Sequence, residues 1–165
     1  MFLSRCVRLA SIVSALLLAI AAPARADITA FIGANTTPNN RPARGLAFGM
    51  GLMVIGFEFE YSATSDSSDP ATLAPALKSG SGNVLLQTPV AIGGFQPYFT
   101  TGVGVYHETL GEHSDTNITI NTGGGAKINL AGPLRLRVDY RVFKLGSGAL
   151  YSPAHRIYAG LNLKF

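Results

Sequence analysis

Three histidines share the second half of the chain with serine and acidic side chains, a combination that nucleophilic catalysis uses. His113 is followed directly by Ser114, and acidic residues occupy positions 108, 112 and 115. A serine becomes a nucleophile when a histidine accepts its proton and a third group orients that histidine. Neighbouring side chains in a loop diverge, which argues against a pairing of His113 with Ser114. We therefore assign no catalytic residue, and an enzyme that uses His107, His113 or His155 stays an alternative.

A second group of candidate residues consists of ionisable side chains at every other position of alternating segments. Strand side chains point to opposite faces with a period of two, so residues of one parity share a face. The ionisable residues on the polar face are Glu58, Glu60, Glu108, Lys127, Arg135, Arg137, Asp139, Arg141, Arg156 and Lys164. Charges that leave water must pair, because their desolvation is otherwise prohibitive. We predict an ion-paired cluster in which Glu58 and Glu60 face Arg135, Arg137 and Arg141.

The alternation that positions these side chains is sharpest over residues 134–144 and 155–165. In the first segment, even positions from 134 to 142 are apolar or aromatic, and the odd positions carry most of the charges. In the second, the odd positions from 157 to 165 are all apolar, and the sequence ends on Phe165. Chain ends usually lie in water, whereas a strand whose apolar face meets lipid has no such conflict.

Segments of this kind, each of about ten residues, recur between stretches rich in turn residues. The predicted strands are 27–35, 44–53, 56–64, 80–90, 97–108, 116–128, 134–144 and 155–165. The first, third, fifth and seventh connections (36–43, 65–79, 110–115 and 145–153) are long and polar, and the other three are short. No run after the N-terminal segment has a helical period or the roughly 20 apolar residues of a membrane-spanning helix.

Residues 1–26 are interpreted as a cleavable signal peptide, with Arg5 and Arg8 before an apolar stretch and an Ala-x-Ala site at positions 24–26. The stretch is about 14 residues long, too short for a membrane anchor. Cleavage removes Cys6, so residues 27–165 have no thiol for a disulfide or a metal. It also lowers the formal charge from +4 to about +1. Because no basic block is present, we expect no nucleic-acid partner.

An even number of strands with alternately long and short connections is typical of a transmembrane barrel whose termini lie in the periplasm. Hydrocarbon also requires closure, since an open sheet edge leaves backbone groups without partners. The predicted fold class is all-β, an eight-stranded antiparallel up-and-down transmembrane β-barrel over residues 27–165. The alternative is a secreted β-sandwich that ends on an edge strand.

The pattern Tyr158-x-Gly160-x-x-Leu163-x-Phe165 resembles the C-terminal insertion signal of bacterial outer-membrane β-barrels. With the run Leu-Arg-Leu-Arg-Val-Asp-Tyr-Arg at 134–141, it makes the chain similar to the outer membrane protein A barrel domain and the outer membrane protein X type. The resemblance implies a monomer in the outer membrane of a Gram-negative bacterium. It also implies contact with outer-membrane lipid and lipopolysaccharide, and recognition of the C-terminal strand by the barrel-assembly machinery.

The bore of an eight-stranded barrel is just wide enough for side chains to fill. We therefore expect a side-chain plug and a structural or surface-interaction role for loops outside the cell. The alternatives are a narrow pore and a lipid A-modifying hydrolase or acyl transferase, although the deacylase's histidine-x-serine pattern is not found. Lys144 falls on the lipid face at the outer end of its strand, where it could contact lipopolysaccharide phosphates. No Gly-x-Gly-x-x-Gly loop or metal-ligand pattern predicts a cofactor.

Overall fold

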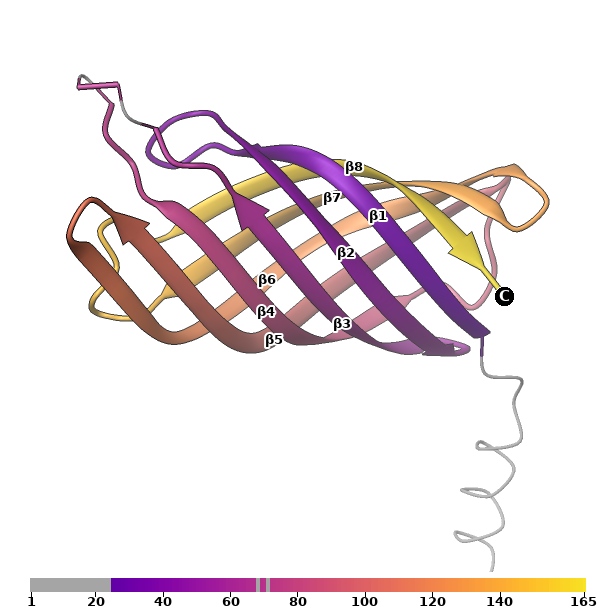
Figure 1. Ribbon diagram of the computed structural model, residues 1–165. Helices are drawn as coiled ribbons and strands as arrows, with labels where there is room; N and C mark the ends of the chain where they lie inside the picture. Colours follow the sequence, from indigo (N-terminus) through magenta and orange to yellow (C-terminus); the bar gives the residue numbers. More distant parts are fainter. Residues whose placement is uncertain (1–24, 68, 71) are drawn as a thin grey trace, which may run out of the picture.

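The structure, a computed structural model that describes residues 25–67, 69–70 and 72–165, is a closed antiparallel β-barrel. Its strands are β1 (Arg25–Asn35), β2 (Arg41–Leu52), β3 (Ile55–Thr64), β4 (Ala76–Gln87), β5 (Phe95–Leu110), β6 (His113–Ala131), β7 (Leu134–Leu145) and β8 (Ala154–Lys164). Each strand pairs with its neighbours in the sequence, and β8 closes the ring on β1 (Figure 1). The predicted fold class is confirmed. No described helix is long and apolar enough to cross a membrane.

The two ends of the barrel differ in their connections. Both ends of the described chain meet at one end, where Ala26 and Phe165 exchange backbone hydrogen bonds of 3.0 and 2.9 Å (Figure 1). We call this the terminal end; it also carries the connections 53–54, 88–94 and 132–133. The opposite, loop end carries the connections 36–40, 65–75, 111–112 and 146–153. In barrels of this type the short turns and the termini face the periplasm.

The predicted signal peptide lies almost entirely outside the described residues. The structure describes the chain from Arg25, and the first two residues of β1, Arg25 and Ala26, pair with Gly51 and Met50. The predicted cleavage after Ala26 therefore falls inside β1, just before Asp27. Cleavage at this point stays a prediction.

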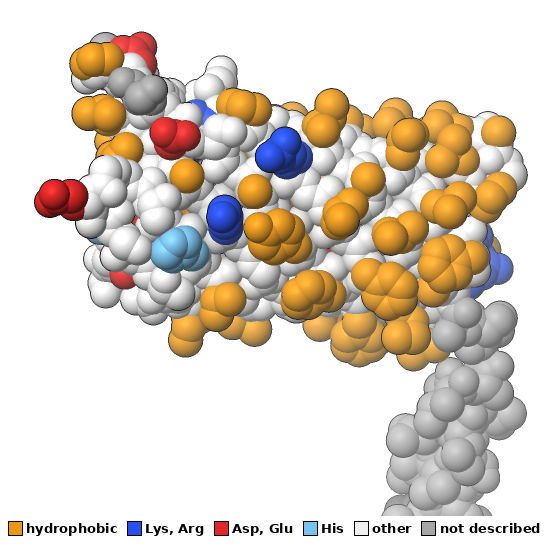
Figure 2. Space-filling model, in the orientation of Figure 1, with side chains coloured by type: hydrophobic (Ala, Val, Ile, Leu, Met, Phe, Trp, Pro, Cys, Tyr) orange, Lys and Arg blue, Asp and Glu red, His pale blue; other side chains and the backbone are white. Residues whose placement is uncertain are grey.

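The barrel is apolar outside and charged inside. On β7 and β8 the apolar parity faces outward, with Leu161 56% exposed, whereas Arg137 and Arg141 are fully buried in the bore. Figure 2 shows hydrophobic side chains over most of the outer wall in view, with charged groups towards the two ends. This arrangement is unfavourable in water, because apolar side chains are exposed and charged side chains are buried. In a lipid bilayer the exposed apolar side chains contact hydrocarbon in place of water, so the outer wall fits a membrane.

Glycines make room where large side chains cross the bore. A Cβ atom on Gly125 of β6 would lie 2.6 Å from the hydroxyl of Tyr98 on neighbouring β5. A Cβ on Gly160 of β8 would lie 2.8 Å from the Cβ of Phe31, whose ring stacks on Tyr158 with centroids 4.0 Å apart. Both separations are shorter than van der Waals contact, and the backbone oxygens of Val138 and Ala30 would lie as close or closer, at 2.1 and 2.6 Å. An alanine at either position would therefore force the neighbouring strand to shift.

The predicted boundaries fail most clearly at the fifth connection. Residues 110–115 are not a polar loop: β5 runs to Leu110, β6 begins at His113, and only Gly111 and Glu112 turn the chain. Residues 113–118 of β6 pair with β5 and not with β7, so this hairpin extends past the end of β7. A paired segment that stands in water needs no apolar face, which is why its polarity resembles that of a loop. The strands β2 and β4 also begin earlier than predicted, at Arg41 and Ala76.

The lipid-facing wall should tolerate a new lysine at the loop end but not at mid-depth. Val103 and Thr109 both point outward on β5; Val103 pairs with Gly82 in the middle of β4, and Thr109 with Ala76 at its loop end. We expect Val103→Lys to lower the free energy of unfolding by about 2–4 kcal/mol and Thr109→Lys by about 0–1 kcal/mol. Reversible urea unfolding in phospholipid vesicles measures both values. Equal costs would contradict the membrane depth assigned here.

Candidate functional site in the barrel interior

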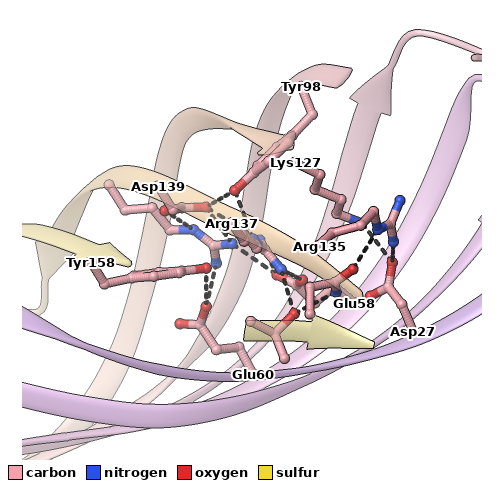
Figure 3. A network of polar contacts seen from close by, with 12 residues as sticks. Asp27, Glu58, Glu60, Tyr98, Lys127, Arg135, Arg137, Asp139 and Tyr158 are labelled. Atoms are coloured by element: carbon pink, nitrogen blue, oxygen red, sulfur yellow. Dashed lines mark hydrogen bonds and ion pairs between the residues drawn. The ribbon is translucent and has the colours of Figure 1, made fainter. Parts of the chain in front are cut away.

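The middle of the bore is crossed by ion pairs between β3 and β7. Arg141 contacts Glu58 at 2.8 Å, Glu60 at 3.2 Å and Asp139 at 3.0 Å. Arg137 forms a second bridge, to Glu58 and to Asp139, the latter at 3.2 Å. Figure 3 shows Arg137, Glu58 and Asp139 of this group converging inside the barrel. In a ring of eight strands, β3 and β7 lie on opposite sides. The ion pairs therefore span the bore.

Side chains of β5 and β8 complete this central network. Tyr98 donates its hydroxyl hydrogen to Asp139 and accepts a hydrogen bond of 2.7 Å from Nε of Arg137. Arg156 contacts Glu60 and donates to the hydroxyl of Ser62. All of these side chains are buried. The Tyr98 hydroxyl thus satisfies hydrogen-bonding groups of a carboxylate and of a guanidinium that would otherwise be buried without a partner.

The central network is balanced in charge. It contains three carboxylates and three guanidinium groups, from Glu58, Glu60, Asp139, Arg137, Arg141 and Arg156. Desolvation of so many charges is expensive, and only close pairing with further hydrogen bonds offsets it. The two carboxylates of β3 alternate with the outward-facing Phe57, Phe59 and Tyr61, so the same strand supplies both the charged lining and the apolar wall.

A smaller ionic group lies nearer the terminal end. Oδ2 of Asp27 contacts Nζ of Lys127 at 2.6 Å and a guanidinium nitrogen of Arg135 at 2.9 Å. Arg135 also donates to Asn162 at 2.7 Å and to Gln96 at 3.2 Å. The sequence prediction paired Arg135 with Glu58 and Glu60, and this is wrong. Arg135 sits one inward position nearer the terminal end than Arg137, so Asp27 is its partner.

The loop end of the bore is closed by a different kind of packing. Leu77, Tyr106, Phe143, Leu145 and Ala154 form an apolar cluster inside the barrel. Beside it, Glu108 is buried, contacts His113 at 3.0 Å and accepts a hydrogen bond of 2.8 Å from the backbone of Leu150. Glu108 thus belongs to the loop end and not to the central network.

The remaining predicted site residues occupy two regions. In β8, Tyr158 and Gly160 face the bore, whereas Leu163 and Phe165 face outward at the terminal end. Lys144 is exposed on the outer wall at the loop end of β7. Lys164 lies half-buried at the mouth of the terminal end.

Sequence reasoning missed two residues that organise the interior. Asp27 falls on the inward parity of β1, and this could have identified it as the partner of Lys127 and Arg135. Arg41 was placed in a loop, but it begins β2 and its guanidinium donates to the backbone carbonyls of Pro75 and, at 2.8 Å, Thr37. Carbonyl acceptors carry no sequence signal, so nothing indicated this role.

Within the described residues, the three histidines contact a threonine, a glutamate and a tyrosine side chain. His107 bonds to Thr116 at 2.7 Å, His113 to Glu108 and His155 to Tyr140 at 2.6 Å. Within the described part of the chain, no histidine hydrogen-bonds a serine hydroxyl and no group of three or more His, Cys, Asp and Glu side chains could hold a metal ion.

Breaking the central network should destabilise the barrel strongly. Glu58 contacts both Arg137 and Arg141 and is 4% exposed. We expect Glu58→Gln to cost about 3–5 kcal/mol, because two buried guanidinium groups lose a charged partner. Urea unfolding in detergent micelles measures the cost. The matched control is Glu112→Gln on the exposed turn, expected within about 0.5 kcal/mol of wild type. Equal effects of the two variants would contradict this account of the network.

Comparisons with known proteins find similarity in structure alone. No protein-family model and no curated protein matches the sequence. The N-terminal β-barrel domain of Pseudomonas aeruginosa OprF superposes with a TM-score of 0.64 at 15% identity, covering 86% of this chain and 97% of that one. Neisserial surface protein A gives 0.63 at 16% identity, with coverages of 86% and 96%.

A third similar structure is the outer membrane enzyme PagL, with a TM-score of 0.53 at 15% identity and coverages of 84% and 98%. At these identities the comparisons define the fold and leave the activity to be argued from the residues. The closed antiparallel ring superposes on all three structures over most of each chain. The chain therefore has the fold of the small eight-stranded β-barrels that span the outer membrane of Gram-negative bacteria.

Proposed function

We propose that the protein is a closed outer-membrane scaffold that holds an interaction surface outside the cell. The observation that carries this proposal is the ionic network between β3 and β7, which fills the middle of the bore with paired side chains. A solute that crosses would have to separate buried ion pairs, at a cost of several kcal/mol for each ion. The narrow pore is thus the less favoured function.

The connections at the loop end form one linked surface, which supports a role in binding. Nδ2 of Asn39 donates to the carbonyl of Thr72 at 3.0 Å, so the first and third connections are joined. The hydroxyl of Tyr151 donates to the carbonyl of Leu73 at 3.0 Å, which joins the seventh connection to the third. Connections held against one another lose less entropy when a partner binds than free loops would.

A conductance measurement tests the closed bore. We expect wild-type protein in planar bilayers to give no steady current steps, because the central network leaves no continuous path. In Glu58→Ala/Arg137→Ala the main pair across the bore is absent, so we expect current steps to appear. The heat-modifiable mobility of both proteins on gels verifies that the barrels are folded. Steady wild-type conductance equal to that of the variant would refute the closed scaffold.

The outward-facing cations of the described strands lie near one end of the wall, and we propose that they bind lipopolysaccharide. Arg44, Lys78 and Lys144 are exposed, point outward and lie near the loop ends of β2, β4 and β7. Figure 2 shows such groups interrupting the apolar wall near the loop end. No carboxylate on a described strand shares this outward face: Asp27, Glu58, Glu60, Glu108 and Asp139 are buried inside, and Asp115 accepts a hydrogen bond from the inward Tyr106. The unbalanced positive charge fits lipid phosphates.

Removal of these cations should weaken the protein's preference for lipopolysaccharide. In bilayers that contain lipopolysaccharide, we expect Lys144→Gln to lose about 1 kcal/mol of unfolding free energy relative to wild type. In phosphatidylcholine alone we expect no loss. The matched control is Lys164→Gln, the same change at the terminal end, which should be insensitive to lipopolysaccharide. If the two variants respond alike, the contact assigned to Lys144 is wrong.

We propose further that β8 delivers the chain to the barrel-assembly machinery. Leu163 and Phe165 present an apolar outer surface at the terminal end, where the strand closes on β1. The pairing of β8 with β1 closes the ring. Before closure, the unpaired edge of β8 can form backbone hydrogen bonds with a strand of the assembly machinery.

A further inference from the structure

The terminal end of the bore contains a cavity of about 290 Å³, which we call the vestibule. Its lining includes Asp27, Lys127, Arg135 and Lys164, and its inner end reaches Glu58 of the central network. That network and the apolar cluster beyond it fill the rest of the bore. The vestibule is therefore open towards the periplasm and closed towards the outside of the cell.

The vestibule lies where three inward positions of neighbouring strands are glycines. Gly49, Gly51 and Gly56 hold inward positions at the terminal ends of β2 and β3 and line the cavity. On the facing strands, β6 and β7, the corresponding level carries Lys127 and Arg135, which are 4% and 6% exposed. The sequence thus places empty space opposite two buried cations.

The vestibule has an excess of positive charge. Lys127 and Arg135 share one carboxylate oxygen, Oδ2 of Asp27. The ammonium group of Lys164 has no hydrogen-bond or ion-pair partner among the described residues. Glu58, the other carboxylate of the lining, is already engaged by two arginines. The excess does not depend on Arg25, since cleavage after Ala26 would replace its charge with the α-ammonium group of Asp27.

The rest of the lining sets the shape and polarity of a ligand. Leu85, which is buried and points inward, and Val90 form an apolar side near the mouth. Oδ1 of Asp27 is buried and has no hydrogen-bond partner, so a hydroxyl donor would satisfy it. A volume of this size holds about ten water molecules, and hence a ligand of similar count in non-hydrogen atoms.

We propose that the vestibule binds a small organic anion from the periplasm, with a phosphate or carboxylate group on an apolar body. The anionic group lies against Lys127, Arg135 and Lys164, where the low dielectric of the bore strengthens the attraction. The apolar body lies against Leu85 and Val90. The site is independent of the loop surface, because the central network separates the two.

Phenyl phosphate is a suitable probe, with benzyl alcohol as its neutral counterpart. The experiment titrates each into the protein purified from outer membranes in a neutral detergent, and follows backbone amide shifts by NMR. We expect phenyl phosphate at millimolar concentration to shift Gly49, Gly51 and Gly56, and benzyl alcohol to leave them unchanged. Absence of these shifts, equal shifts with benzyl alcohol, or shifts confined to the region of Arg44 and Lys78 would overturn the proposal.

Two variants locate the site and one serves as the control. Lys164→Gln removes a cation without a partner, and we expect affinity for phenyl phosphate to fall about fivefold. Gly56→Leu fills the cavity without changing its charge, since a Cβ there lies 3.5 Å from the Cβ of Leu85, and should abolish binding. The control Glu112→Gln also changes one charge, on the exposed turn at the loop end of the barrel, and should bind as wild type does. Wild-type affinity in both vestibule variants, with heat-modifiable gel mobility intact, would exclude the vestibule as the site.

Discussion

Complete pairing of the backbone is the constraint on which the rest of this structure depends. A strand in hydrocarbon has no water to satisfy its amide and carbonyl groups, so every strand needs a neighbour on each side. The pairing of β8 with β1, over nine registered positions from Asp27–Lys164 to Asn35–Arg156, satisfies that need. Once the ring is closed, every strand has one face towards lipid and the other towards a narrow bore, which sorts the side chains.

The sorting explains why so many charges lie in so small an interior. Charged side chains at mid-depth are costly against lipid, so those that alternate with apolar residues along a strand point into the bore. There they need partners at short range. The solution differs along the axis. Charge balance is reached at mid-depth through carboxylates of β3 and β7 and guanidinium groups of β7 and β8. Apolar side chains fill the bore at the loop end, and a cavity lies at the terminal end.

Most of the barrel could be predicted because period-two alternation determines both the strand and its inward face. Arg137, Asp139 and Arg141 could be placed in the bore from parity alone, and all three are buried there. Partner choice could not be predicted, because it depends on register across the ring. Arg135 pairs with Asp27, which is distant in sequence. It lies one inward position nearer the terminal end than Arg137, and it is Arg137 that pairs with Glu58.

Polarity was also a poor guide wherever strands leave the membrane. The hairpin of β5 and β6 keeps alternating and pairing after it passes the end of β7, but its residues have the composition of a loop. In the same way, Arg41 and Pro42 were assigned to a turn although they pair with Asn35 and Ala34 of β1. Water removes the demand for an apolar face, and with it the signal on which the prediction relied.

The same hairpin has a consequence for how the protein meets its surroundings. A protease must thread an extended, unpaired stretch through its cleft, and flexible loop tips supply such stretches most readily. Here the backbone up to Leu110 and from His113 is committed to cross-strand bonds, and the tip consists of two residues. The hairpin of β5 and β6 therefore offers a protease no long unpaired stretch, and we expect it to resist cleavage outside the membrane.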